Sequence, residues 1–191
     1  DKINNFKPHQ NVILIVEPLK RKSLDEFLSE KNNSYKLPLR LMILDQVTDP
    51  QNVGAIIRSA YAFKMNALAL SQTNSPFESS SMSKASSGAI EKLQIIKLSN
   101  MSRAIKNLQK SNFRVYGLAH DGQGNIFDLE KEDGNVAIIV GSEGKGLRRL
   151  TREKVDQLFE IPINPNSESL NVSNAASISM FLLQKNIIKI K

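Results

Sequence analysis

Three separated segments of the chain combine small polar residues with a short apolar run typical of a buried strand. Apolar strands that end in small polar loops build the ligand sites of α/β proteins, at the carboxyl ends of parallel strands. We therefore expect the three segments to meet in one ligand site. Two of them lie in the last third of the chain, so the site is assembled from distant parts of the sequence. The segments are Leu44–Phe63, Val136–Leu150 and Phe159–Phe181.

The stretch Gly141–Gly146 (GSEGKG) lies between a predicted strand and a predicted helix. This context favours an anion-binding or nucleotide-binding loop, because glycines let backbone N–H groups approach a ligand at a helix N-terminus. Leu147 stands where a Walker loop carries its lysine, and the glycine spacing is not that of a dinucleotide-binding fingerprint. The stretch by itself does not distinguish a ligand site from a turn.

The helix predicted after Asp49-Pro50 carries two further candidates. Asn52 lies in its first turn, where side chains point toward the strand ends. Arg58 lies among apolar neighbours, and a partly buried guanidinium is well suited to a phosphate or a carboxylate. The alternative is an exposed arginine whose aliphatic stem covers the core.

The polar loop of residues 164–171 leads into the last predicted helix. Asn171 is expected to cap that helix, with a role in a site as the alternative. His9 and His120 lie outside the three segments, so Ser–His–acid chemistry lacks a base there. No His or carboxylate cluster has the spacing of metal ligands, which predicts that no metal is bound.

The formal net charge is +7, and five basic residues lie in Lys145–Lys154, directly after the glycine loop. A basic surface favours the binding of nucleic acid. The alternative is a charge excess that only increases solubility. The chain has no tryptophan and few aromatic residues, which disfavours a base-stacking platform.

Composition also excludes several classes of protein. The 191-residue chain has no cysteine, which excludes disulfides and thiolate sites and predicts a reducing, cytoplasmic environment. No apolar run approaches the length of a membrane span, and residues 1–10 do not read as a signal peptide. A start without methionine suggests a chain trimmed from a longer one.

Short predicted strands alternate with predicted helices along the chain, which indicates an α/β protein with a mostly parallel sheet covered on both faces. Ser23 and Glu26 form a capping-box pattern at the first helix, and the polar residues 32–37 predict a linker. The predicted strands are residues 12–17, 39–44, 67–70, 94–98, 114–118, 136–140 and 158–161. The predicted helices are residues 23–31, 51–63, 82–87, 101–111, 147–155 and 172–186.

Taken together, the three segments resemble the SpoU (TrmH-like) branch of the SPOUT superfamily, whose members are RNA ribose 2′-O-methyltransferases. Leu44–Ala60 looks like motif one (D-x-V-x-D-P-x-N-x-G-x-x-x-R-S-A), Ile139–Leu147 like motif two, and Ile161–Ala175 like motif three. The similarity runs from about residue 39 to the C-terminus. Within the branch, Thr151–Ile163 is similar to the bacterial 23S rRNA guanosine-2′-O-methyltransferases.

The resemblance implies a deep trefoil knot at the carboxyl end, a homodimer, and S-adenosylmethionine as the methyl donor. It assigns residues 1–37 to the remnant and linker of an N-terminal RNA-binding domain, and residues 38–191 to the methyltransferase domain. The implied substrate is a guanosine ribose in 23S ribosomal RNA. Transfer RNA guanosine-18, and a non-catalytic RNA-binding protein on the same fold, are the alternatives.

The resemblance also assigns roles to individual residues. Arg58 would be either the base or a cation that stabilises the developing alkoxide. Pro165 departs from the family, which usually carries glycine there, so we expect a stiffer loop or one hydrogen bond fewer. The implied catalytic set is Asn52, Arg58, Glu143, Ser169 and Asn171. The implied donor-binding set is Gly141, Ile161 and Leu170. Arg148, Arg149 and Arg152 would grip the RNA backbone.

Overall fold

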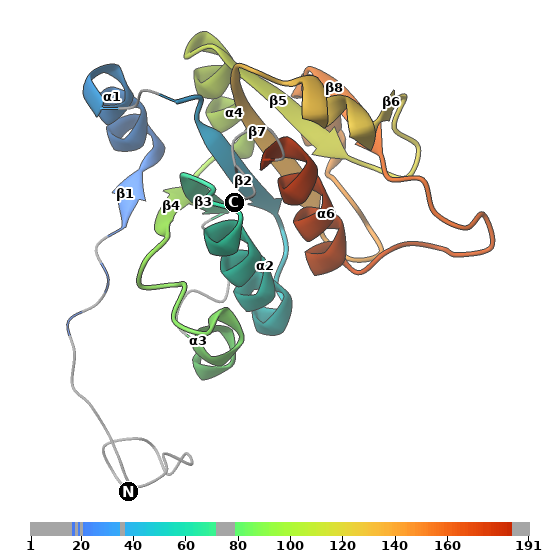
Figure 1. Ribbon diagram of the computed structural model, residues 1–191, viewed down its shortest axis with the longest axis horizontal. Coiled ribbons are helices and arrows are strands. Elements are labelled where there is room, and N and C mark those ends of the chain that lie inside the picture. Colours follow the sequence, from blue (N-terminus) through green and yellow to red (C-terminus); the bar gives the residue numbers. More distant parts are fainter. Residues whose placement is uncertain (1–16, 18, 20, 35–36, 72–78, 185–191) are drawn as a thin grey trace, which may run out of the picture.

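The computed structural model describes residues 17, 19, 21–34, 37–71 and 79–184 (Figure 1). In this part of the chain eight strands form one sheet, in the order β1-β4-β3-β2-β7-β5-β8-β6, and every neighbouring pair is parallel. The predicted parallel α/β sheet is thus confirmed. The strands are β1 (Lys22–Ser23), β2 (Arg40–Asp45), β3 (Ala67–Ser71), β4 (Gln94–Leu98), β5 (Phe113–Leu118), β6 (Gly124–Asn125), β7 (Asn135–Gly141) and β8 (Gln157–Glu160).

Helices cover both faces of this sheet, because alternate side chains of each buried strand point to opposite sides. Met42 and Leu44 of β2 pack with α2 and α6, whereas Leu41 and Ile43 pack with α1 and α4. Figure 1 shows α2 and α6 in front of the sheet, with α3 next to α2. The helices are α1 (Leu24–Ser34), α2 (Pro50–Ala62), α3 (Ser80–Ser86), α4 (Met101–Lys110), α5 (Arg149–Lys154) and α6 (Val172–Gln184), with a 3-10 helix, η2 (Ile126–Lys131).

Local signals explain how α2 begins and how closely it packs. Asp49 caps the helix, since its carboxylate accepts the N–H groups of Gln51 and Asn52, and Pro50 occupies the first helical position. A Cβ atom at Gly54 would lie 2.6 Å from the carbonyl oxygen of Met82, so glycine lets α2 and α3 approach each other. The cap and the packing together fix the direction in which the first turn of α2 points.

The predicted elements agree well with the observed ones, apart from several boundaries. The capping box is confirmed, because Ser23 and Glu26 exchange reciprocal hydrogen bonds. The first helix continues to Ser34, so the predicted linker of residues 32–37 begins later than expected. β1, β6 and η2 were not predicted, because two-residue strands and a single 3-10 segment carry no periodicity. Residues 12–16 of the first predicted strand, and residues 185–186 of the last predicted helix, lie outside the described residues.

A polar network lies near the amino ends of β2 and β7, at the edge of the sheet away from the glycine loop. Arg40 is 1% exposed and donates to the carbonyl oxygens of Glu132 and Gly134. The Tyr116 hydroxyl donates to Glu132 Oε1 at 2.6 Å. Burial, together with this hydrogen bond, raises the pKa of Tyr116 to about 12.

No helix in the described ranges is long and apolar enough to cross a membrane.

Candidate active site and its family

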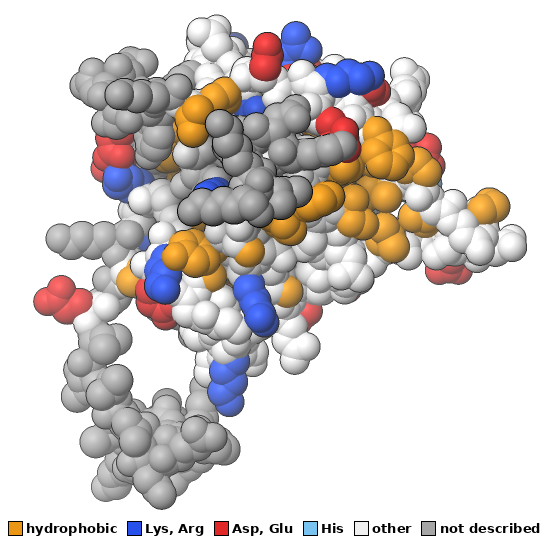
Figure 2. All heavy atoms as spheres, in the orientation of Figure 1, with side chains coloured by type: hydrophobic (Ala, Val, Ile, Leu, Met, Phe, Trp, Pro, Cys, Tyr) orange, Lys and Arg blue, Asp and Glu red, His pale blue; other side chains and the backbone are white. Residues whose placement is uncertain are grey.

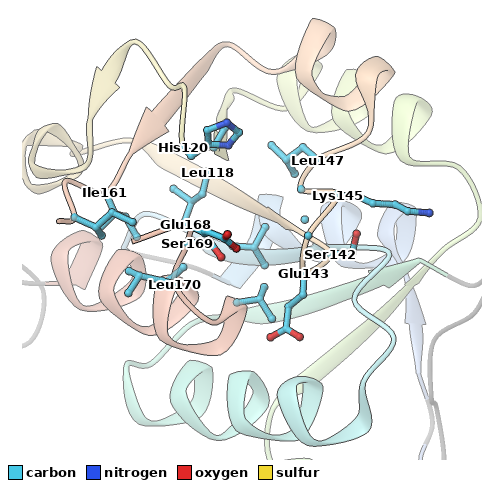
Figure 3. A pocket seen from close by; sticks show the side chains of 18 of the residues that line it. Leu118, His120, Ser142, Glu143, Lys145, Leu147, Ile161, Glu168, Ser169 and Leu170 are labelled. Atoms are coloured by element: carbon cyan, nitrogen blue, oxygen red, sulfur yellow. The ribbon is translucent and has the colours of Figure 1, made fainter. Parts of the chain in front are cut away.

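A pocket with a volume of about 330 Å³ opens at the carboxyl ends of β5, β7 and β8, which are neighbours in the sheet (Figure 3). Its walls come from three loops, and two of these belong to the segments that the sequence analysis expected to meet. The third segment, which contains α2, reaches the site through Asn52. The lining residues are Leu118–His120, Val140–Leu147, Arg152, Ile161, Ile163, Glu168–Leu170, Val172 and Ala175.

The glycine loop folds back tightly on the end of β7. The N–H group of Gly146 donates to the carbonyl oxygen of Ser142 at 2.9 Å, and these two residues form an isolated bridge. Gly144 and Gly146 adopt φ values of +76° and +64°, which side chains other than glycine rarely tolerate. A Cβ atom at Gly141 would lie 2.1 Å from the backbone of Gly146. Glycine is therefore required at Gly141 for the loop to close in this way.

One side chain of this loop connects it to two helices. Figure 3 shows Glu143 pointing from the loop toward α2. Glu143 Oε1 accepts from Asn52 Nδ2 at 3.0 Å and from Asn171 Nδ2 at 2.7 Å, and Asn171 Nδ2 also donates to Asn52 Oδ1 at 3.0 Å. We call these three residues the amide–carboxylate cluster. It brings together one residue from each of the three segments.

Both amides of the cluster stand at helix N-termini. Asn52 lies in the first turn of α2, and Asn171 directly precedes α6. Asn171 Oδ1 accepts from the backbone N–H of Ser173 at 2.8 Å, so the predicted cap is confirmed. The same side chain caps α6 with its oxygen and binds Glu143 with its nitrogen. The Glu143 carboxylate thus accepts hydrogen bonds from two side chains that stand at helix N-termini.

Arg58 does not lie in the setting that the sequence suggested. Its side chain is exposed on α2, and it is absent from the lining of the pocket. The reason is the helical phase of α2, because Val53, Ile56 and Ile57 define the face that packs on the sheet and position 58 falls outside that face. The prediction of a partly buried guanidinium was wrong.

Each of the three arginines predicted to contact RNA pairs with a carboxylate of the chain itself. Arg149 Nη1 lies 2.5 Å from Glu153 on the same helix. Arg152, which lines the pocket, donates to both oxygens of Asp121 at 2.9 and 2.7 Å, and this bond holds the pKa of Asp121 below its usual value. The Arg148 guanidinium binds Asp45, which is 0% exposed.

Pro165 causes no visible loss in the loop after β8. The N–H group of Ser167 donates to the carbonyl oxygen of Asn164 at 2.8 Å, and Asn164 Oδ1 accepts from the N–H of Asn166 at 2.9 Å. Proline occupies the second position of the resulting turn, which it favours because its fixed φ suits that position. Proline in place of the family's glycine therefore stiffens this turn, and the turn needs no N–H donor at position 165.

The structure adds pocket residues that the sequence analysis did not assign. Leu118 ends β5, His120 follows two positions later, and both line the pocket, although His120 was placed outside the site. A polar residue shortly after a predicted parallel strand was the available signal. This signal was weak, because the sequence does not show that β5 lies between β7 and β8 in the sheet.

The pocket combines features that suit a small molecule with polar and apolar parts. Leu118, Val140, Ile161 and Leu170 supply apolar surface, and Gly141 also lines the pocket. A volume of about 330 Å³ falls within the range of small-molecule sites. Among the residues that the structure describes, no group of three or more His, Asp or Glu side chains is placed to hold a metal ion.

A parallel sheet with such a pocket and a polar cluster beside it defines a ligand-binding α/β protein of the enzyme type. Residues 39–181 match the SpoU rRNA Methylase family, and the chain belongs to this family.

Several curated relatives are similar to the chain over most of its length. The chain is 39% identical over 185 residues to the 23S rRNA (guanosine-2′-O-)-methyltransferase RlmB of Haemophilus influenzae, covering 95% of this chain and 73% of that protein. It is 42% identical over 141 residues to RlmB of Xylella fastidiosa, covering 74% of this chain and 56% of that protein. An uncharacterized tRNA/rRNA methyltransferase of Mycobacterium leprae is 36% identical over 178 residues, with 93% and 57% covered. The chain thus spans little more than half the length of several relatives.

Solved structures share the fold. The AdoMet-bound rRNA methyltransferase of Sinorhizobium meliloti aligns with a TM-score of 0.77 at 23% identity, covering 89% of this chain and 62% of that one. The SpoU methyltransferase AviRb of Streptomyces viridochromogenes, in complex with AdoMet, aligns with a TM-score of 0.72 at 21% identity, covering 80% and 59%.

Proposed function

We propose that the chain is the catalytic part of an enzyme that transfers a methyl group from S-adenosylmethionine to the ribose 2′-hydroxyl of a guanosine in 23S ribosomal RNA. The observation that carries this proposal is the pocket itself, with Gly141 in its lining and the amide–carboxylate cluster beside it. The names of the relatives at 39% and 42% identity support the substrate, and the AdoMet-bound neighbours support the donor.

The donor would be held by Gly141, Ile161 and Leu170, which line the pocket. When bound, it supplies a methyl group activated by a positively charged sulfur. The pocket walls exclude water from one side, and backbone groups of the glycine loop offer hydrogen-bond donors and acceptors. No metal takes part in this proposal.

The polar residues beside the pocket would orient the ribose, because a weak nucleophile gains most from correct placement. Asn52, Glu143 and Asn171 form one bonded unit, and Ser169 lies on the adjacent wall. Arg58 would stabilise the developing alkoxide and clamp a phosphate. We favour this role over that of a base, because a guanidinium offers five N–H donors and no acceptor.

Since Arg58 is absent from the pocket of its own chain, we propose that a second copy supplies it. An apolar surface on neighbouring elements supports a homodimer, because Tyr61, Ile178, Phe181 and Phe127 are all exposed. Phe181 of α6 also packs edge-on against Phe63, which follows α2. Figure 2 shows hydrophobic side chains gathered on the side of the molecule that carries α6 and the last strands. Such patches mark interaction surfaces.

The RNA would lie over the basic residues after the glycine loop, as the net charge of +7 suggests. Arg149 and Arg152 can exchange their carboxylate partners for phosphates, because both pairs are partly exposed. Arg148 is the weakest of the three candidates, since its partner is buried. Residues 1–37 would connect to an RNA-binding part, because the family match begins at residue 39. Action on ribosomal RNA would place the enzyme in the cytoplasm.

We also propose that the carboxyl-terminal segment forms the trefoil knot. The tight contact between the loop after β5 and the end of β8 supports this. A Cβ atom at Gly122 would lie 2.5 Å from the backbone of Phe159, and the N–H of Ala119 donates to the carbonyl oxygen of Phe159 at 3.0 Å. A crystal structure in which the backbone of this segment forms no knot would contradict the proposal.

The test is methyl transfer from labelled S-adenosylmethionine to 23S ribosomal RNA and to transfer RNA transcripts, followed by mass-spectrometric mapping of methylated riboses. We expect a 2′-O-methylguanosine in the ribosomal RNA, and its loss in Arg58→Ala with donor binding retained. Arg103→Ala, on the exposed face of α4, is the matched control. Methylation of transfer RNA alone would show that transfer RNA, and not ribosomal RNA, is the substrate. Donor binding without any transfer would indicate a non-catalytic RNA-binding protein.

A further inference from the structure

A buried carboxylate lies directly beside the pocket without lining it. Asp45 is the last residue of β2 and is 0% exposed. Its Oδ1 binds Arg148 Nε at 2.7 Å and Arg148 Nη2 at 2.6 Å, and its Oδ2 accepts from Thr151 Oγ1 at 2.7 Å. The backbone N–H of Arg148 lies 3.3 Å from Oδ2. A buried carboxylate with four such contacts is strongly tied to its surroundings.

These contacts hold both ends of the glycine loop. Asp45 is the register partner of Gly141 in the pairing of β2 with β7, so its backbone lies beside the first residue of the loop. Arg148 and Thr151 follow the loop at the start of α5, where no side chain of the helix itself provides a cap. One residue therefore fixes the point where the loop leaves the sheet and the point where it enters the next helix.

The tip of the loop is held by the same segment of chain. Asn52, which binds Glu143, follows Asp45 by seven positions through the turn that begins α2. The loop is thus attached at its base by Asp45 and at its tip by Asn52. A loop attached at three points keeps the shape of the pocket wall before any ligand arrives, which reduces the entropy lost on binding.

We propose that Asp45 is a positioning residue for the methyl donor, acting through the glycine loop and never touching the donor. The proposal deepens the proposed function and rests on it. It also gives Arg148 a different role from the predicted RNA contact, because the guanidinium holds the loop in place. If Asp45 served only the stability of the fold, its loss would weaken the whole sheet equally and leave the loop no more mobile than its surroundings.

The experiment compares the 191-residue chain with Asp45→Asn, Thr151→Val and the control Glu153→Gln. The control removes an exposed ion pair on the same helix, α5. Donor affinity is measured by calorimetry with S-adenosylmethionine, and loop mobility by hydrogen exchange of the amides of residues 142–148. For Asp45→Asn we expect a dissociation constant raised about tenfold or more, and loop exchange accelerated about tenfold, while the amides of β3 keep their protection.

Thr151→Val keeps the Asp45–Arg148 pair and removes one hydrogen bond, so it should show the same pattern at about threefold. If Asp45→Asn fails to fold, Thr151→Val still tests the role of Asp45. Donor affinity within twofold of the parent chain, with unchanged loop exchange, would overturn the role of Asp45. Failure of the parent chain itself to bind the donor would instead refute the proposed function, and the exchange data would still report on Asp45.

Discussion

The side-chain amide of Asn171 donates to Glu143 Oε1 at 2.7 Å, joining the start of α6 to the glycine loop after β7. The oxygen of the same amide caps α6 through Ser173. A single residue thus links the beginning of a helix to the polar cluster beside the pocket. Because the two contacts use different atoms, substitutions can separate the cap from the cluster.

Asn171→Ser should preserve the fold and impair the reaction. Serine caps helices about as well as asparagine, so the free energy of unfolding should change by less than about 0.5 kcal/mol. It lacks the NH₂ group that binds Glu143 and Asn52, so methyl transfer should fall at least about tenfold. Thermal unfolding and single-turnover transfer measure the two effects. Asn171→Ala, which loses both contacts, should in addition destabilise the protein by about 1 kcal/mol. Full activity in the serine variant would remove Asn171 from the proposed catalytic set.

Mixing two inactive variants should restore activity if Arg58 acts from a second copy. Arg58→Ala and Glu143→Gln should each lose transfer alone. In a mixed dimer, one site would combine the intact Glu143 of one copy with the intact Arg58 of the other. Random exchange should then give about a quarter of the parent activity. Light scattering confirms the dimer, and absence of any recovery after verified exchange would assign Arg58 to its own chain.

Gly141→Ala should weaken donor binding without unfolding the protein. The added methyl group would lie 2.1 Å from the backbone of Gly146, and backbone cannot move as a flexible side chain does. We expect the loop to shift and the donor dissociation constant to rise at least about tenfold. Gly134→Ala is the matched control, since a Cβ atom there meets nothing within 4 Å. Equal calorimetric affinities for the two variants would contradict the role of the loop.

Pro165→Gly should leave donor affinity within twofold of the parent value. The second position of the turn between Asn164 and Ser167 donates no N–H, so restoring the family's glycine adds no needed hydrogen bond. Glycine would lower the free energy of unfolding by about 0.5–1 kcal/mol, because it gives the unfolded chain more freedom. Calorimetry and thermal unfolding test both statements. A marked gain in affinity would show that proline costs the site a contact.

Tyr116 should titrate above the usual range of a tyrosine. Burial raises the pKa of Tyr116 from 10.0 to about 12, so the folded state holds its proton where the unfolded state releases it. The resulting stabilisation is present below pH 10 and is lost as the pH rises toward 12. Tyrosinate absorbance should show a late-titrating group that disappears in Tyr116→Phe. A parent chain without any such late-titrating group would refute this assignment.

Sequence alone determined the local elements and two of the loops that line the pocket. Apolar periodicity and caps such as Asp49 act between near neighbours, which is why the parallel α/β arrangement and the glycine loop were predictable. The predicted cap at Asn171 is local in the same sense, since its partner is Ser173.

Tertiary structure alone decided which distant residues meet. The order of β7, β5 and β8 brings His120 to the pocket, and no periodicity encodes that order. From the sequence, Arg148 was predicted to contact RNA. In the fold it binds Asp45, which lies 103 positions earlier and is buried. A buried carboxylate requires a cation beside it. Arg58 became exposed because the packing face of α2 leaves it outside. Side-chain partners depend on desolvation and on strand order, and both exist only in the folded chain.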